Sequence, residues 1–402
     1  MTRIFLMLMA VKLSMAHSAE GFTFDDAVEK ISQHEAIEQL EIKARSLKSE
    51  SELKGSWGDP TVKVTAKNYP VDYLTDEKSP MTGLEFGVST KIAVTTKYGH
   101  IEKALAKFSH SAQMESQNKK QKLLKTFWTY IIETKKIEEE IKIFNENLNW
   151  MEKILKVSNR LYSNGKISQQ ALLDIQIRKS ELEANISNKQ YELLEQDDRL
   201  KYLFEFKTKL NRQSVPWKIL ETGEFSKDYN EEILRSLVEA KEHLLTASQL
   251  SYIPDLTLNF GYTQRSSIDN LGDFVTAAVT FPIPISRSKY SAHSKAAHDK
   301  LEADRILKNY RKYKETEANR LKHVTTKIER EIEILNTRTL QYAVNSREIT
   351  SKSYSLGDTS YIELLQSELK LQRLRIKKTI LTSRLLKNRL DYKFLVGGKL
   401  YE

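Results

Sequence analysis

The chain has 402 residues, 29% of them charged, and its 64 lysines and arginines exceed its 54 aspartates and glutamates by a net charge of +10. Basic and acidic residues are interleaved, with no dense basic run that contains aromatic residues, and this argues against a nucleic-acid partner. The absence of cysteine excludes disulfide bonds and a cysteine-linked lipid anchor.

The N-terminus predicts an exported protein. Arg3 precedes an apolar run, Ile4–Leu13, that a single lysine interrupts, and small residues follow it. This order is typical of a secretory signal peptide, here residues 1–18, with cleavage after Ala16 or Ser18. A frayed amphipathic N-terminus is the alternative. Beyond this segment, no apolar run reaches the length of about 18 residues that a membrane-spanning helix needs.

The first predicted helix is Phe22–Lys54. Thr23 is expected to cap it, and Asp25 and Asp26 fall in its first turn, where carboxylates interact favourably with the helix dipole. Gly55 and the glycine and proline that follow it end the helical pattern.

Two pairs of strands are predicted from alternating apolar and polar residues. The first pair covers Val62–Ala66 and Leu84–Val94, and the second covers Leu256–Tyr262 and Val275–Ile285. Each strand has one apolar and one polar face. This pattern is typical of a membrane barrel, although a soluble antiparallel sheet produces the same alternation.

Two stretches without proline, Met81–Val215 and Ile285–Glu402, have helical periodicity on either side of one internal glycine. The longest predicted helices contain about 60 residues and would span roughly 90 Å. A shorter helix is expected at Asn230–Ser251. The predicted long helices are 100–161, 168–209, 289–354 and 360–395.

The two long hairpins match one another at a constant offset of 192 residues. A Tyr-x-x-Gly-x-x-Ser motif, followed by a Leu-Leu pair, occurs at each turn. Seven of ten heptad core positions are apolar in Leu172–Leu203, and seven of ten are apolar in Leu364–Leu395, a period typical of coiled coils. The sequence therefore predicts a tandem duplication, with repeats at 19–215 and 216–402. The motif residues are Tyr162, Gly165 and Ser168, and Tyr354, Gly357 and Ser360.

Motifs for catalysis or metal binding are absent from the sequence. It contains no His-Glu-x-x-His motif, no phosphate-binding glycine-rich loop and no cysteine ligand set. We therefore expect no enzymatic activity, no metal site and no cofactor. The eight histidines are interpreted as surface or packing residues.

These features together resemble the TolC family of outer-membrane efflux proteins over nearly the whole mature chain. The resemblance is carried by the duplication, by the strand pair before each long hairpin and by the two turn motifs. Two segments add to it, Pro254–Tyr262 and Phe281–Ile285.

The strand layout is similar to the heavy-metal-efflux branch of that family. Asp59–Thr61, Asn68 and the Pro282–Pro284 run followed by Arg287 are the similar segments. The glycine-lysine-arginine usual after the second strand of that branch is replaced here by Lys97-Tyr98-Gly99, so the branch stays open. The cargo cannot be inferred, because the resemblance implies a passive tunnel.

The resemblance implies a mainly α fold with a β membrane portion. Three chains would form a homotrimer, in which the tandem-duplicated coiled-coil hairpins build an α-helical tunnel and four strands per chain build a 12-stranded β-barrel. Such a trimer would lie in outer-membrane lipid with a periplasmic extension. It would be the exit duct of a tripartite efflux or type I secretion system, coupled through a periplasmic adaptor to an inner-membrane pump.

The resemblance also implies two functional regions. The adaptor-docking tip would comprise Tyr162, Gly165, Ser168, Tyr354, Gly357 and Ser360, with both tyrosines packed beside the turns; alternatively, both glycines are only helix C-caps. The periplasmic aperture would comprise Glu363, Gln366 and Asp358. Three symmetry-related Glu363 carboxylates would favour cations there. Gln366 weakens that ring, and Glu363 could instead be an ordinary solvated residue.

Two other classes of protein remain as alternatives. A periplasmic coiled-coil adaptor also combines strands with a helical hairpin, but usually has one hairpin between lipoyl-like half-motifs. A soluble structural coiled-coil protein would have no need of four amphipathic strands in two matched positions.

Overall fold

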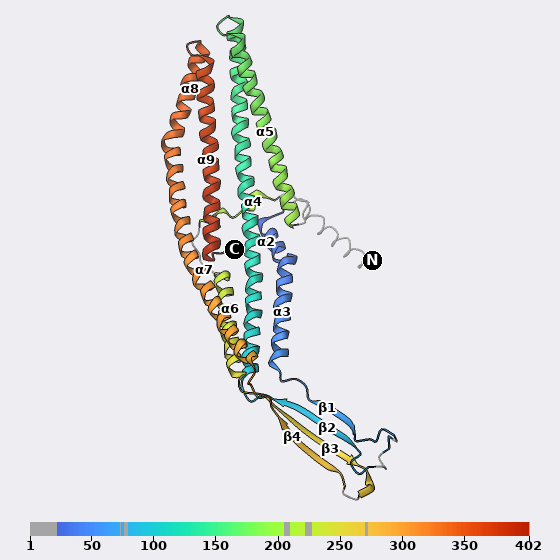
Figure 1. The fold of residues 1–402 in the computed structure, drawn as a ribbon. Helices are drawn as coiled ribbons and strands as arrows, with labels where there is room; N and C mark the ends of the chain where they lie inside the picture. Colours follow the sequence, from blue (N-terminus) through green and yellow to red (C-terminus); the bar gives the residue numbers. More distant parts are fainter. Residues whose placement is uncertain are drawn as a thin grey trace, which may run out of the picture. The chain divides into compact units, whose positions relative to one another are not determined.

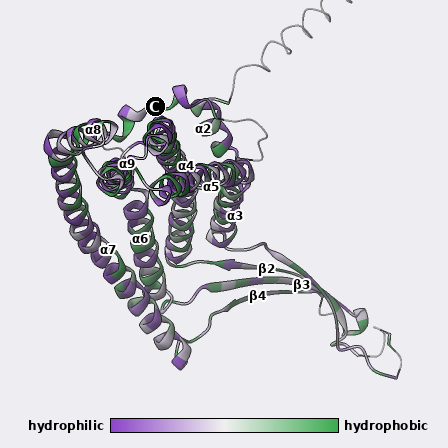
Figure 2. Cartoon of the chain, turned by 90° about the horizontal axis from the view of Figure 1, so that it is seen from above, coloured by the Kyte–Doolittle hydropathy of each residue, from purple (hydrophilic) through white to green (hydrophobic). Residues whose placement is uncertain are grey.

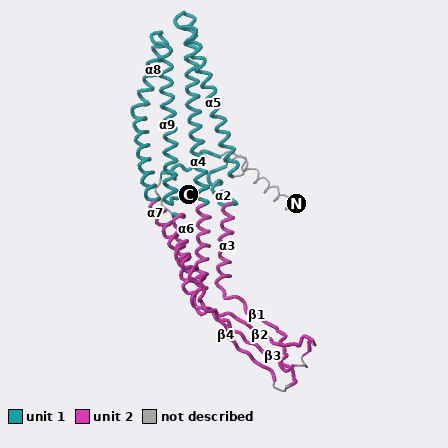
Figure 3. Tube along the Cα trace, viewed as in Figure 1, with its two compact units in different colours: residues 1–35, 119–228, 313–402 teal, residues 36–118, 229–312 magenta. Residues whose placement is uncertain are grey.

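The computed structural model describes residues 22–72, 74–75, 79–204, 210–221, 227–269 and 272–401. The predicted signal peptide lies outside these residues. The chain divides into two compact units (Figure 3). Unit 1 comprises residues 1–35, 119–228 and 313–402, and unit 2 comprises residues 36–118 and 229–312. Each unit therefore draws on both halves of the sequence.

Unit 2 contains one antiparallel sheet of four strands in the order β1-β2-β3-β4. The strands are β1 (Thr61–Lys67), β2 (Gly83–Ile92), β3 (Leu256–Arg265) and β4 (Phe274–Thr280). The 3₁₀ turn η5 (Ser267–Asp269) lies between β3 and β4. All four predicted strands are present, and the two pairs join through β2 and β3.

One face of this sheet is apolar and the other is polar. Residues that pair directly across strands share a face, so the row Val62, Val88, Phe260 and Ala277 defines the apolar face. The neighbouring row, which contains Lys63 and Thr276, belongs to the polar face. The apolar face is uncovered within the chain. Its exposed large side chains are Val62, Val64, Phe86, Val88, Phe260, Tyr262, Val275 and Val279.

The last predicted strand is shorter than expected. The prediction ran to Ile285, whereas β4 ends at Thr280. Pro282 and Pro284 explain the difference, because proline has no backbone N–H to donate to a neighbouring strand. β2 likewise ends at Ile92, two residues before the predicted end.

The helices of unit 2 pack through small side chains. They are most of α3 (Glu35–Gly55), the first part of α4 (Lys97–Ser163), α6 (Tyr229–Leu250) and the first part of α7 (Arg287–Ile334). Small side chains let helix backbones approach closely, as the 2.7 Å bond from Ser109 Oγ to the carbonyl of Ala44 shows. The buried small residues include Ala44, Ser51, Ala104, Ser109, Ala112, Ser116, Ser236, Ala240 and Ala247.

Unit 1 contains the two long hairpins (Figure 1). The first pairs the second part of α4 with α5 (Gln169–Phe204), and the second pairs α8 (Leu340–Leu356) with α9 (Tyr361–Val396). One turn of π-helix, η6 (Leu335–Thr339), joins α7 to α8. All four predicted long helices are therefore present; α5 ends at Phe204, and the predicted remainder to Lys209 lies outside the described residues.

The prediction of one continuous helix over Phe22–Lys54 is wrong. The segment forms α2 (Phe24–Ser32) and α3, separated at Gln33 and His34. Thr23 caps α2 as expected and forms a reciprocal capping box with Asp26. The interruption falls next to the boundary between the two units, so α2 packs in unit 1 while nearly all of α3 belongs to unit 2.

Trp128 of α4 holds distant segments of unit 1 together. The side chain is fully buried, and its indole N–H donates to the carbonyl oxygen of Leu400 at 2.8 Å. Its ring lies 5.0 Å from that of Phe24 on α2. It also lies 5.8 Å from the ring of Trp217, in the 3₁₀ turn η4 (Trp217–Leu220) that follows η3 (Arg212–Ser214).

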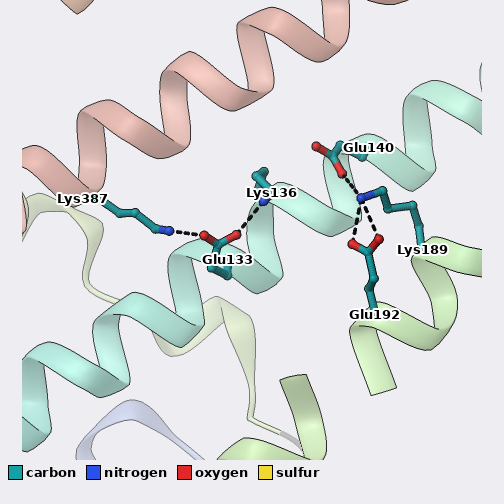
Figure 4. A network of polar contacts seen from close by, with 6 residues as sticks. All are labelled: Glu133, Lys136, Glu140, Lys189, Glu192 and Lys387. Carbon is teal, nitrogen blue, oxygen red and sulfur yellow. Dashed lines mark hydrogen bonds and ion pairs between the residues drawn. The ribbon is translucent and has the colours of Figure 1, made fainter. Parts of the chain in front are cut away.

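Ion pairs connect α4 to α5 and to α9 in unit 1 (Figure 4). Glu133 of α4 accepts bonds from Lys136 and from Lys387 of α9, and Lys189 of α5 lies 3.0 Å from Glu140 of α4. Burial acts to raise the pKa of Glu133, but the two ammonium groups outweigh it and hold that pKa below its ordinary value.

The helices carry hydrophilic and hydrophobic residues side by side (Figure 2). Within the described ranges, no helix combines the length and the apolar character needed to cross a membrane.

Two substitutions of Trp128 should destabilise unit 1 to different degrees. Trp128→Ala should lower the free energy of unfolding by about 3–5 kcal/mol, because it leaves a large cavity. Trp128→Phe should cost about 1–3 kcal/mol, since it leaves the Leu400 carbonyl without its donor. Thermal unfolding followed by circular dichroism would measure both, and equal melting temperatures for Trp128→Ala and the parent chain would contradict this role.

Candidate functional site: the hairpin tips

The two hairpin turns have the same backbone geometry. Gly165 and Gly357 adopt φ of +70° and +86°, a left-handed conformation that residues with a Cβ rarely adopt. At each turn, the residue after the glycine donates its N–H to a carbonyl five residues back. These bonds are 2.9 Å from Lys166 to Leu161 and 3.0 Å from Asp358 to Ser353. The glycines therefore end the helices and permit the tight reversal.

The motif serines start the returning helices. Ser168 Oγ accepts the backbone N–H of Ala171 at 3.2 Å, and Ser360 Oγ accepts that of Glu363 at 3.3 Å. Each bond satisfies a donor that the first turn of a helix leaves free. The glycine and the serine of each motif thus have the same structural task at the two turns.

The motif tyrosines differ between the two turns. Tyr354 is 1% exposed, and its hydroxyl lies 2.8 Å from Ser158 Oγ on α4. Tyr162 is 43% exposed. The expectation that both tyrosines pack beside the turns holds within the chain for Tyr354 but not for Tyr162. Tyr162 follows the buried Leu161, and one residue along a helix rotates a side chain by about 100°.

Tyr354 belongs to a buried cluster that joins the two hairpins. The cluster takes Leu161 from α4, Ile175 from α5 and Leu364 from α9. Two polar contacts reinforce it: the Tyr361 hydroxyl bonds to Asp174, and the Lys166 amine lies 3.5 Å from the Leu356 carbonyl. The two tips therefore lie side by side in unit 1.

The three residues predicted to form an aperture lie on the surface of the second tip. Asp358 follows the turn glycine, Glu363 lies in the first turn of α9, and Gln366 lies almost one turn further on. All three side chains are exposed within the chain. This arrangement leaves them available to face other copies or solvent.

A buried polar network below the tips was not predicted. Glu368 of α9 is 0% exposed and pairs with Arg347 of α8 at 3.3 Å. Arg178 of α5 donates to Gln372 of α9 and so links the two hairpins. A signal for Glu368 was present in the sequence, since it lies four residues after Leu364 and three before Leu371, on the apolar face of α9.

Burial raises the pKa of Glu368 above its ordinary value of 4.5, against the attraction of the Arg347 guanidinium. One carboxylate oxygen, Oε1, has no hydrogen-bond partner among the described residues. The negative charge of the ionised Glu368 carboxylate is therefore only partly stabilised by its partners. No cluster of three or more histidine, aspartate or glutamate side chains suited to a metal ion occurs in the part of the chain that the structure describes.

Glu368 should make the stability of the helical region depend on pH. Because the folded chain binds this proton more tightly than the unfolded chain, the free energy of unfolding should fall as pH rises from 4.5 through the folded pKa. Glu368→Gln should remove that fall, measured as melting temperature against pH. Glu348→Gln, the same change at an exposed position of α8, is the control. An unchanged pH slope in Glu368→Gln would refute the assignment.

No family model matches the sequence, and no curated protein is significantly similar to it. Solved structures, in contrast, match almost the entire chain. The outer membrane protein VceC of Vibrio cholerae has a TM-score of 0.76 at 15% identity, over 93% of this chain and 96% of VceC. CusC, whose crystal structures concern folding and transmembrane channel formation, has a TM-score of 0.73 at 15% identity, over 94% of both chains.

The outer-membrane channel OprN has a TM-score of 0.76 at 11% identity, over 94% of this chain and 90% of OprN. The expected architecture of long coiled-coil hairpins with four strands per chain is therefore confirmed. The resemblance seen in the sequence is confirmed at the level of structure: the chain has the fold of the TolC-family outer-membrane channels.

Proposed function

We propose that this chain is the outer-membrane channel of a tripartite efflux or type I secretion system. It is exported, assembles as a homotrimer and acts as a passive, non-enzymatic exit duct. The observation that carries this proposal is the four-stranded sheet with one uncovered apolar face, on a chain whose helices form two long hairpins.

The sheet has the dimensions and polarity of a segment of a membrane barrel. β2 and β3 contain ten residues each, within the range of about 9–11 that a tilted strand needs to cross a bilayer. The apolar face would contact lipid and the polar face would contact water. A soluble protein rarely leaves an apolar patch of this kind uncovered.

Closure of the sheet explains why several copies are needed. β1 and β4 each have a partner on one side only in the described sheet. Pairing β1 of one copy with β4 of the next removes both edges, and three copies supply twelve strands. The matched hairpins also support two structural repeats, 19–215 and 216–402.

The tips are the proposed docking region for a periplasmic adaptor, which would join the channel to an inner-membrane pump. The exposed motif residues Tyr162, Gly165 and Gly357 would contact the adaptor, while Ser168, Ser360 and the buried Tyr354 would hold the turns in shape. In the trimer, Glu363, Gln366 and Asp358 would line the periplasmic aperture, where the Glu363 carboxylates would favour cations.

The alternative, a periplasmic adaptor or structural coiled coil without a barrel, is not favoured. It leaves the apolar face of the sheet uncovered, and the solved channels match the chain over both its sheet and its helices.

The test is extraction, oligomer mass and planar-bilayer conductance on one purified sample. The parent chain should need detergent, form a trimer and open discrete channels. Ala277→Arg places a charge on the apolar face at the middle of β4 and should reduce membrane insertion, because arginine at mid-bilayer costs about 2–4 kcal/mol. Ala278→Arg, one residue later on the polar face, is the matched control and should insert. A monomer that is soluble without detergent would refute the channel.

Gly357 should be required for efflux but not for assembly. Gly357→Val places a β-branched residue at φ +86°, which distorts the tip while leaving the sheet untouched. The expected result is loss of efflux in cells with the trimer still in the membrane. Gly357→Asn is the control, since asparagine tolerates this conformation, and it should retain activity. Normal efflux by Gly357→Val would count against a role for this tip.

A further inference from the structure

The helix that leads to the second tip contains one turn of π-helix. The π turn η6 occupies Leu335–Thr339, between α7 and α8. The matching position 192 residues earlier falls within α4, which is α-helical from Lys97 to Ser163. A π turn holds one more residue than an α turn and is often found at a functional site. The two hairpins therefore differ at this point.

The buried positions of this helix shift by one residue across η6. Leu321, Ile328 and Leu335 are buried at intervals of seven residues, and the next buried residue, Ala343, follows after eight. In an uninterrupted α-helix, that additional residue would rotate the later positions by about 100°. The π turn absorbs the rotation, so that α7 and α8 both keep their apolar sides in the core.

A second series of apolar residues, exposed to solvent, shifts in the same way. Ile334, Tyr342, Ile349 and Leu356 are all exposed, with Tyr342 at 70% and Ile349 at 67%. Their spacings are eight across η6 and then seven and seven. We call these four residues the outer stripe. Without η6, Ile334 would not lie in line with the other three.

A comparable exposed series occurs on α5. Ile177, Ala184 and Tyr191 follow one another at intervals of seven, and Leu173 lies one turn before them. All four side chains are exposed within the chain. We call them the α5 stripe. In unit 1, α5 and α8 belong to different hairpins.

We propose that η6 aligns the outer stripe with the α5 stripe of a second copy of this chain. This inference rests on the proposed function, in which copies form a closed ring around an axis that follows the helices. The two tips are level within one chain, because Lys166 contacts the carbonyl of Leu356. Rotation about such an axis keeps residues of neighbouring copies at the same level.

The residues of the two stripes lie at matching distances from the tips, measured along the helices. Ile349 lies eight residues before Gly357, and Ile177 lies eight residues after the start of α5, so both are about 12 Å from the tips. Tyr342 then falls opposite Ala184, a large side chain against a small one. Ile334 falls opposite Tyr191. Fourteen residues of α5 cover about 21 Å, and the π turn lets fifteen residues of the outer stripe cover a similar length.

Charge favours the same pairing. α5 contains seven acidic and five basic residues. In the facing hairpin, α8 contains one acidic and two basic residues, and its partner α9 contains three acidic and nine basic residues. An acidic helix from one copy would therefore lie against a basic hairpin from the next. Such complementarity supports a heterologous contact, in which two different surfaces meet and the rotation closes a ring.

Cysteine cross-linking tests the pairing, because the chain contains no other cysteine. The double variant Tyr191→Cys with Ile334→Cys probes the side of η6 away from the tips and should form covalent dimers and trimers on oxidation of the detergent-extracted protein. Leu194→Cys with Ile349→Cys is the control: its positions differ in level by about 25 Å, too far for a disulfide. A trimer in which the first pair fails to cross-link would overturn this inference alone, whereas a chain that is not a trimer would overturn the proposed function.

Single-residue deletions in the cross-linking background test the role of η6. Removal of Thr337 shortens the π turn by one residue, so the buried positions and the outer stripe continue in a regular α-helix, and the trimer and the cross-link should persist. Removal of Asn145, 192 residues earlier in the regular helix α4, should abolish both, since nothing there absorbs the rotation. Loss of the cross-link after removal of Thr337 would show that η6 does not set the register.

Discussion

A four-stranded sheet with one apolar face and two unpaired edges is unfavourable in water unless other groups cover that face and those edges. The rest of the structure follows from this constraint. In the proposed channel, lipid covers the face and strands from other copies close the edges. The long hairpins obey a similar rule, because each helix buries one apolar side against its partner and leaves another side exposed. The single chain is thus best understood as part of a larger assembly.

The sequence predicted the elements well wherever one local signal dominated. Alternation located all four strands, and the motif glycines and serines located both turns, because left-handed backbone and N-capping have few chemical solutions. The fold followed from the order of these elements. Even the end of β4 was recoverable, since Pro282 forbids the continuation that the alternation suggested.

Features set by packing were not predictable in this way. No proline or glycine marks the break between α2 and α3, which lies next to the boundary between the two units. The π turn leaves no local mark either and is recognised only when buried and exposed positions are compared on both sides of it. Glu368 was not predicted, because a charged residue on a helix is usually exposed to solvent. Its position on the apolar face of α9 decides otherwise.

The two tips have the same backbone conformation but expose different side chains. Tyr354 is buried and its hydroxyl bonds to Ser158, whereas Tyr162 is exposed at the first turn. A ring of three such chains would present six turns of two alternating kinds, so its end would have threefold and not sixfold symmetry. A partner supplied in six copies would have to bind in two different ways. A partner supplied in three could use one kind of turn and ignore the other.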